Sequence, residues 1–312
     1  MKPRKHKTRD FSVLKQMLKE FCIEHNVEDI YLQPGNAGDA LISSGTSVLL
    51  EDLDLTLNPV DSLDFDKLRA QNQTGIVFSG GGVLNQFYGV GWSMLNDIKS
   101  HGLVVFMLPC TISFDGVECS PFEQDDILFL REKISLSNCR NRTPSKTFLS
   151  HDLALYPPVD FWIQTVERNI TFQSRIKLYK TILKQIGKRR FIRLISGQHV
   201  PLHAYRLDGE SFFRPIGLTY NLDLSKIAGQ ASQVSWVENH AISAQFLFLL
   251  SRFKTVQTDR LHVSIGSFIL SIECELRDGA YWKNMAVFDH SLATDDTSVV
   301  WINNDSTLTS NA

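Results

Sequence analysis

One five-residue segment combines a cation, a titratable imidazole and the expected start of a helix. The segment is Thr258-Asp259-Arg260-Leu261-His262, and it follows a short apolar run. At a helix start, unpaired backbone N–H groups attract negative charge, and the Arg260 guanidinium adds to that attraction. His262 can hold or donate a proton near neutral pH. These residue types predict a site for a doubly charged anion. The alternative is a structural Asp259–Arg260 pair beside an ordinary capped helix.

A glycine-rich turn in the first half also lies between an expected strand and an expected helix. Its sequence is Gly35-Asn36-Ala37-Gly38-Asp39, which matches neither the P-loop pattern nor the dinucleotide-binding pattern. Two glycines let the backbone turn tightly and approach a ligand closely. Asn36 can donate and accept hydrogen bonds. Asp39 is either a reacting carboxylate or an N-cap that accepts backbone N–H bonds, and both interpretations stay open here.

Two further candidates follow expected strands in the first half. Gly80-Gly81-Gly82 exposes consecutive backbone N–H groups that suit an anion, and a flexible turn is the alternative. Arg131 can clasp a carboxylate or a phosphate with two parallel hydrogen bonds, unless it pairs with Glu132 at the surface. Open α/β sheets place their ligands at the carboxyl ends of strands, which is where both candidates lie.

Three weaker candidates complete the set. Asp152 follows an expected strand, Arg206 and Glu210 follow another, and Lys283 lies in a late polar loop. All four side chains are charged and suit contacts with a polar substrate. A solvated polar loop explains each of them equally well.

These candidates require an α/β framework, and the apolar pattern predicts one. Strands are expected at residues 29–32, 53–57, 75–78, 103–108, 127–130, 146–149, 202–207, 233–236, 254–258 and 268–273. Helices are expected at residues 11–25, 40–51, 161–190 and 238–252, and directly after residue 258. This alternation predicts βαβ units and mainly parallel sheets. Two consecutive prolines, Pro157-Pro158, interrupt the pattern, so we expect two Rossmann-like domains, residues 1–160 and 161–312. The run Lys188-Arg189-Arg190 closes the helix 161–190, where it would complement the helix dipole.

Composition excludes several classes of protein. The 312 residues are 43% hydrophobic, with 32 basic and 34 acidic side chains, so nothing favours a nucleic-acid partner. No apolar run is long enough to span a bilayer, and the amphipathic stretch Phe11 to His25 is unlike a signal peptide, so we expect a cytoplasmic protein. The basic stretch Lys2 to Lys7 is either a solvated tail or a peripheral contact with the inner membrane surface. Five scattered cysteines indicate neither a zinc site nor a disulfide framework.

Taken together, the motifs resemble the polysaccharide pyruvyl transferase family. The resemblance covers roughly residues 29 to 290, and its specific parts are Gly35 to Asp39 and Thr258 to His262. The other matching features are Gly80-Gly81-Gly82, Arg131-Glu132 with Ser135, Asp152, Arg206 with Asp208 and Glu210, and Tyr281 to Asn284. The stretch Phe161 to Arg190 has no counterpart in the family pattern.

The resemblance implies a GT-B-like fold with the active site in the cleft between two Rossmann-like domains. It implies phosphoenolpyruvate as the donor. The sequence contains no cluster of suitable metal ligands, so we expect activity without a metal or a cofactor. The acceptor would be a pair of sugar hydroxyls on a glycan or a lipid-linked oligosaccharide. The product would be a cyclic pyruvate ketal on an exopolysaccharide, a capsule or a cell-wall glycan.

The same resemblance suggests a role for each candidate. His262 is the expected acid, or else a phosphate ligand, and Asp39 is the expected base, with Asp152 as a second choice. The expected donor-binding residues are Arg260, Leu261, Arg131, Ser135, Asn36, Gly81 and Lys283. The expected acceptor-binding residues are Asp152, Arg206 and Glu210.

Two other functions remain open from the sequence. One is a nucleotide-sugar-dependent glycosyltransferase of the same fold, in which Glu238, at the start of a late helix, would bind the ribose hydroxyls. The other is a non-catalytic subunit of a polysaccharide assembly complex, which would have no need of Asp39, Arg260 and His262.

Overall fold

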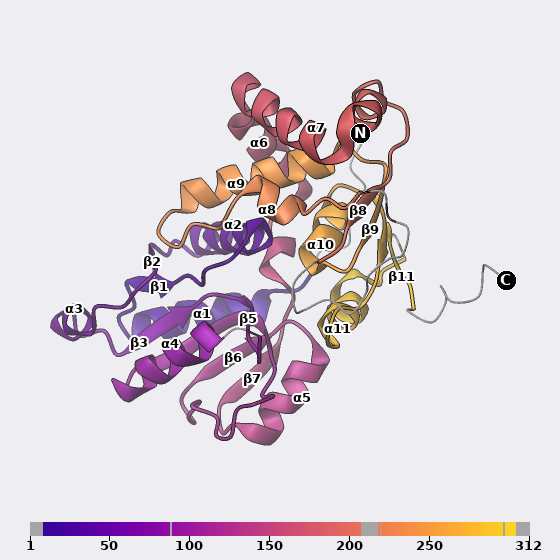
Figure 1. Ribbon diagram of the computed structural model, residues 1–312. Coiled ribbons are helices and arrows are strands. Elements are labelled where there is room, and N and C mark those ends of the chain that lie inside the picture. The colour runs from indigo at the N-terminus through magenta and orange to yellow at the C-terminus, as the bar shows by residue number, and fades with distance from the viewer. Residues whose placement is uncertain (1–8, 88, 207–217, 219, 296, 304–312) are drawn as a thin grey trace.

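The computed structural model describes residues 9–87, 89–206, 218, 220–295 and 297–303. Its strands form two parallel sheets, one in each half of the chain (Figure 1). The first sheet has the order β2-β1-β3-β5-β6-β7, and β4 also pairs with β5. Its strands are β1 (Asp29–Tyr31), β2 (Asn58–Val60), β3 (Gly75–Phe78), β4 (Gly81–Leu84), β5 (Val104–Ile112), β6 (Ile127–Leu130) and β7 (Lys146–Leu149). The second sheet has the order β11-β10-β9-β8, with β8 (Leu202–Ala204), β9 (Thr255–Thr258), β10 (Glu273–Leu276) and β11 (Val299–Trp301). The predicted α/β class with parallel sheets is confirmed.

Helices connect the strands and cover the sheets. Those of the first half are α1 (Ser12–Glu24), α2 (Ala37–Asp52), α3 (Phe65–Ala70), α4 (Gly89–Ser100), α5 (Lys133–Arg142) and the short η1 (Leu153–Leu155). Those of the second half are α6 (Val159–Asn169), α7 (Phe172–Ile195), α8 (Leu224–Ala228), α9 (Trp236–Leu250), α10 (Leu261–Ile269), α11 (Lys283–Val287) and η2 (Phe288–Leu292). Within the described residues, no helix is both long enough and apolar enough to cross a membrane.

The central strands of the first sheet are buried on both faces, which explains the largely apolar sequences of β3, β5 and β6. In β5, Phe106 and Leu108 belong to one hydrophobic cluster, whereas Val105 and Met107 belong to another. Alternate residues of a strand point to opposite faces, so the two clusters lie on opposite sides of the sheet. The α1 helix contributes to the first cluster, for example through Leu18, and α4 contributes to the second.

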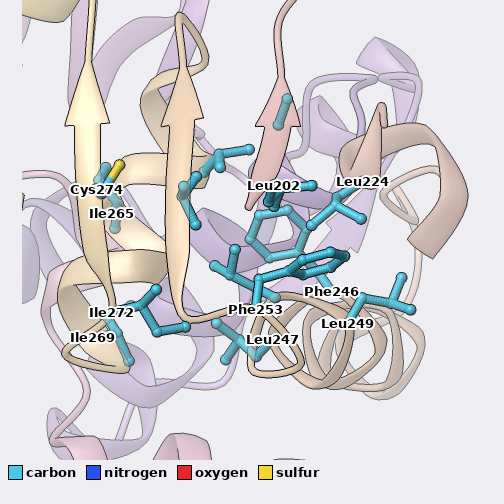
Figure 2. Close-up of a cluster of buried hydrophobic side chains, with 14 of the residues drawn as sticks. Leu202, Leu224, Phe246, Leu247, Leu249, Phe253, Ile265, Ile269, Ile272 and Cys274 are labelled. Atoms are coloured by element: carbon cyan, nitrogen blue, oxygen red, sulfur yellow. The ribbon is translucent and has the colours of Figure 1, made fainter. Parts of the chain in front are cut away.

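A third cluster fills the space between the second sheet and its helices. Figure 2 shows Leu202 and Cys274 on the strands facing Phe246 and Leu247 of α9 and Ile265 of α10. All of these side chains are buried. Burial of such side chains contributes roughly 1.5–3 kcal/mol each relative to exposure, so this core holds α10 firmly against the end of β9.

Helix α2 of the first half packs directly on α9 of the second half (Figure 1). The Ser44 and Ser243 hydroxyls are 3.0 Å apart, and the Ser47 hydroxyl is 2.7 Å from His240 Nε2. The α2 residues Ala37 and Leu41, together with residues of η1, belong to the same cluster as the second sheet. The two sheets are therefore joined by shared apolar packing. The division into domains at residue 160 stays a prediction.

Some predicted elements are wrong, because tertiary contacts override local pattern. Residues 233–236 form no strand: Ser235 caps α9 by accepting the N–H of Glu238, and the Gln233 side chain donates to the Leu32 carbonyl at 2.8 Å. The strand expected at 268–273 begins only at Glu273, because α10 runs to Ile269 and is followed by a left-handed turn. The strand expected at 53–57 lies at 58–60. The predicted helix 161–190 is two helices, α6 and α7.

Two histidines link the halves at a second place. The rings of His151, after β7, and His290, in η2, stack with centroids 4.4 Å apart. His290 Nε2–H donates to the Ser150 carbonyl at 2.8 Å, and His151 Nδ1 lies 2.9 Å from the Ser291 hydroxyl. Burial, the neighbouring His290 and the Arg9 guanidinium lower the pKa of His151 to about 4. Burial also lowers the pKa of His290.

Because the fold lowers the pKa of both histidines, we predict that the protein is less stable at acidic pH. In the unfolded chain His151 titrates near 6.5, so between about pH 6.5 and pH 4 the unfolded state binds more protons than the folded state. The free energy of unfolding should therefore fall as the pH is lowered through this window, by an amount on the order of 1 kcal/mol for His151. Urea titrations at pH 7.5 and pH 5 measure the change. His151→Asn should reduce the pH dependence, and His101→Asn, outside this junction, should not. Equal pH dependence in all three proteins would contradict the prediction.

Candidate active site

A single pocket of about 250 Å³ is lined by residues from both halves of the chain. Its lining comes mostly from the segments that follow strands β1, β6, β8 and β9. The lining residues are Pro34, Gly35, Asn36, Asp39, Gly82, Arg131, Arg206, Ser225, Lys226, Arg260, Leu261, His262 and Lys283. Ligand sites of parallel α/β sheets lie at these carboxyl ends. The pocket is smaller than the roughly 300–1,000 Å³ of drug-sized ligand sites, so it suits a small molecule.

Two helix N-termini reach this pocket, and they differ in their capping. In α2, Asn36 accepts the N–H of Gly38 at 2.8 Å, and Asp39 accepts the N–H of Asn36 at 2.8 Å, so the helix is capped by its own residues. In α10, Arg260 is at the N-cap position, and no side chain within the described chain caps this helix. The first N–H groups of α10, at Leu261 and His262, have no carbonyl four residues back to bond. The α10 end is therefore the better anion site.

Arg260 is held in place at the start of α10. Its backbone N–H donates to the Thr258 hydroxyl at 2.9 Å, and its guanidinium donates to the Asp223 carboxylate. Only 4% of the residue is exposed, although it lines the pocket. A buried, hydrogen-bonded guanidinium is preorganised, so it loses little side-chain entropy when an anion binds.

A buried chain of polar groups lies behind the pocket wall. Arg131 donates to Asp152 at 2.6 Å and to the Thr111 hydroxyl at 2.9 Å. On the other side of the carboxylate, His262 Nε2 lies 3.6 Å from Asp152 Oδ2, which is longer than a hydrogen bond. Burial disfavours the charged carboxylate, but the contacts with His262 and Arg131 outweigh it and hold the pKa of Asp152 well below its usual range. Asp152 is therefore an anion that orients both neighbours.

Two glycines of the motifs make room for these side chains. A Cβ atom at Gly38 would overlap with the His262 imidazole, so the first turn of α2 packs against His262 because residue 38 has no side chain. A Cβ atom at Gly82 would lie 3.0 Å from the Arg131 guanidinium and 3.7 Å from the Lys283 side chain. The glycines thus bring the backbone close to the charged groups of the pocket.

The pocket lining carries an excess of positive charge. Five side chains are cationic: Arg131, Arg206, Lys226, Arg260 and Lys283. The lining carboxylate is Asp39, the buried Asp152 balances Arg131, and the partly buried Asp223 pairs with both Arg260 and Lys226. The α10 N-terminus adds partial positive charge. This balance suits a small ligand with more than one negative charge.

The structure brings together most of the predicted site residues. Asn36, Asp39, Arg131, Arg206, Arg260, Leu261, His262 and Lys283 all line the pocket. Gly81 is next to the lining residue Gly82 and has a positive φ of 133°. Asp152 is fully buried behind His262. Ser135 lies away from the lining, where its hydroxyl bonds the backbone N–H and carbonyl of Ile112. Glu210 lies outside the described residues. Glu238 is exposed in the first turn of α9 and does not line the pocket.

Three contributors were missed from the sequence. Ser225 and Lys226 of α8 line the pocket, and Asp223, which caps α8, holds Arg260. Aspartate is a favoured N-cap residue, so Asp223 marks a possible helix start in the sequence. No local sequence pattern shows that this helix packs against Arg260. Asp278, just after β10, is a further group near Lys283: burial raises its pKa to about 6.

Comparisons with known proteins identify a shared fold and a family. A protein from Klebsiella pneumoniae subsp. pneumoniae NTUH-K2044, whose crystal structure is described as that of a functional uncharacterized protein, superimposes with a TM-score of 0.66. It is 21% identical, and the match covers 95% of this chain and 99% of that chain, so the two share a fold. No curated protein matches significantly. The model of the polysaccharide pyruvyl transferase family matches residues 36–274, which include Asn36 to Asp39 of the glycine-rich turn and the whole α10 motif. The chain therefore belongs to the polysaccharide pyruvyl transferase family.

Proposed function

We propose that this protein transfers the pyruvyl group of phosphoenolpyruvate to two hydroxyls of one sugar, forming a cyclic ketal. The observation that carries the proposal is the pocket in which the uncapped α10 end, Arg260 and His262 lie among further cations. Phosphoenolpyruvate has a carboxylate and a phosphate, so it needs more than one cationic contact. In this proposal Arg260 and the Leu261 and His262 N–H groups bind one anionic group of the donor. Lys283, Lys226 and Arg131 face the other.

His262 is the proposed acid of the first step. Addition of a sugar hydroxyl to C2 of the donor requires a proton at C3, which turns the methylene into a methyl group. The Asp152 carboxylate stabilises the protonated imidazole, and Arg131 keeps that carboxylate ionised. We therefore assign Asp152 a positioning role in place of the acceptor contact expected from the sequence.

Asp39 is the proposed base, because it is the carboxylate on the pocket wall. It takes the proton of the attacking hydroxyl. The second hydroxyl of the same sugar then displaces the phosphate at C2, and its proton leaves with the phosphate. One phosphoenolpyruvate and one sugar diol thus give one ketal and one inorganic phosphate. In this proposal Arg206 contacts the acceptor, a sugar of an exopolysaccharide, a capsule or a cell-wall glycan, and the reaction takes place in the cytoplasm.

Phosphate release tests the reaction. The protein is mixed with phosphoenolpyruvate and a panel of galactosides, glucosides and mannosamine glycans, and phosphate and ketal are measured by colorimetry and mass spectrometry. We expect phosphate and ketal in equal amounts with one acceptor class, and the same rate in EDTA. Thermal stabilisation by UDP or GDP without stabilisation by phosphoenolpyruvate would instead indicate the glycosyltransferase. No phosphate release with any acceptor, and no stabilisation by phosphoenolpyruvate, would indicate a non-catalytic subunit.

A further inference from the structure

Helix α7 concentrates positive charge away from the pocket. It carries eight of the 32 basic side chains of the protein and none of the 34 acidic ones. The remaining residues thus have 24 basic side chains against 34 acidic ones, so the rest of the protein is acidic while this helix is basic. The family pattern does not account for this segment, and the α7 residues do not line the pocket.

The charges lie on the outer side of the helix. Leu178, Ile182 and Ile186 are buried and recur every fourth residue, which defines the inner face. At 100° per residue, Lys177, Lys180 and Lys184 lie on the opposite face, and all three are exposed. Figure 1 shows α7 at the rim of the molecule, with α9 between it and α2. The outer face of α7 is therefore open to a partner.

A kink adds a second group of cations. Gly187 has a φ of 77°, so the helix bends there, and the hollow at the bend is lined by Lys188, Arg189, Arg190 and Arg193. The expected role of the Lys188 to Arg190 run as a dipole cap is wrong, because the run lies inside α7, five residues before its end. The ion pairs among the described residues involve none of the α7 cations. Arg193 donates to the His199 carbonyl, and Arg190 and Arg175 stack on Tyr220 and Phe248, but none of these contacts neutralises the charge that an external anion would meet.

Large apolar side chains stand among the exposed cations. Phe172 is 77% exposed and Ile192 is 50% exposed, and Ile176 and Ile195 are exposed as well. On the segment after the kink, Ile192 is adjacent to Arg193 and one turn from Arg189. A bilayer interface accepts both kinds of side chain, cations at its phosphates and apolar side chains below them. The combination favours a lipid surface.

We propose that α7 docks the protein on the surface of an anionic phospholipid bilayer. The outer lysines and the cations at the kink face the lipid phosphates, and Phe172 and Ile192 insert at the level of the headgroups. The proposal does not depend on pyruvyl transfer, because binding of the protein to vesicles requires neither phosphoenolpyruvate nor an acceptor.

Vesicle flotation of the full chain tests the docking. The wild type should float with vesicles of phosphatidylcholine and phosphatidylglycerol, should not float with phosphatidylcholine alone, and should be released by salt. The triple variant Lys177→Glu, Lys180→Glu, Lys184→Glu should partition on the order of 100-fold more weakly, since each basic residue near an anionic surface contributes about one tenfold step or somewhat less. The matched control is Lys19→Glu, Arg140→Glu, Lys146→Glu, which makes the same charge change at exposed positions elsewhere. It should remain within a few-fold of the wild type.

A second variant separates a bilayer from a soluble polyanion. Phe172→Ser with Ile192→Ser alters only exposed side chains, so the fold should persist, as thermal unfolding can check. This variant should float several-fold less well and yet bind heparin like the wild type. Three results would overturn the proposal: no flotation of the wild type with anionic vesicles, equal loss in the control triple variant, or unchanged flotation of the serine variant. The last result would assign α7 to a soluble polyanion instead.

Discussion

Replacing His262 by alanine should lower kcat by about 100- to 10,000-fold while phosphoenolpyruvate still binds. The imidazole is on the pocket wall, oriented by a buried carboxylate, and 15% of its side chain is exposed towards the pocket side. Removing it leaves the Asp152–Arg131 ion pair intact, so the fold should persist. Initial rates of phosphate release measure kcat, and the shift of the melting temperature with phosphoenolpyruvate measures donor binding. His101→Ala, which changes a histidine outside the pocket, is the matched control.

Arg260→Ala should fail in a different way. It removes a cation at the uncapped α10 end and leaves Asp223 without that partner, so donor binding and turnover should both be lost. In this variant phosphoenolpyruvate should no longer raise the melting temperature. Near wild-type activity in either folded variant would contradict the assigned site.

Partial recovery of the His262→Ala variant by added imidazole would support proton donation over phosphate binding, because a free imidazole can supply the missing proton.

Gly38→Ala should lower activity on the order of 100-fold, with a smaller loss of stability than a clash against the backbone would cause. Residue 38 is in the first turn of α2, where alanine is the better helix former, so local propensity favours the change. The added methyl group would overlap with the His262 imidazole and displace it. A shift of about 1 Å in a reacting group can cost about 100-fold in rate. The measurements are kcat and the free energy of unfolding of the same purified protein.

Gly45→Ala is the matched control on the same helix. A Cβ atom there would overlap with the Leu153 backbone carbonyl, which cannot rotate away as a side chain can. Overpacking of this kind costs about 1–3 kcal/mol, so Gly45→Ala should lower stability more than Gly38→Ala does. Wild-type kcat in Gly38→Ala would show that His262 tolerates displacement, and it would remove the assigned role of the glycine.

The local sequence pattern correctly predicted several short strands of the first sheet. The strands at residues 75–78, 127–130 and 146–149 have the predicted bounds. The first two are short apolar runs that are buried in the sheet and end at polar turns. The strand expected at 233–236 was wrong, because Ser235 is held as the cap of α9 and Gln233 is bonded to Leu32. The four residues Gln-Val-Ser-Trp do not contain that information.

The sequence by itself determined the α/β class, the family and the two motifs that start α2 and α10, because strand, turn and helix starts depend on residues only a few positions apart. Tertiary structure alone decided that Asp152 lies behind His262, that α8 contributes Lys226 to the pocket, and that Gly38 makes room for the imidazole. The physical reason is distance along the chain. Asp152 and His262 are brought together by packing between α2, α9 and the second sheet, and no local sequence pattern encodes which buried surfaces will meet.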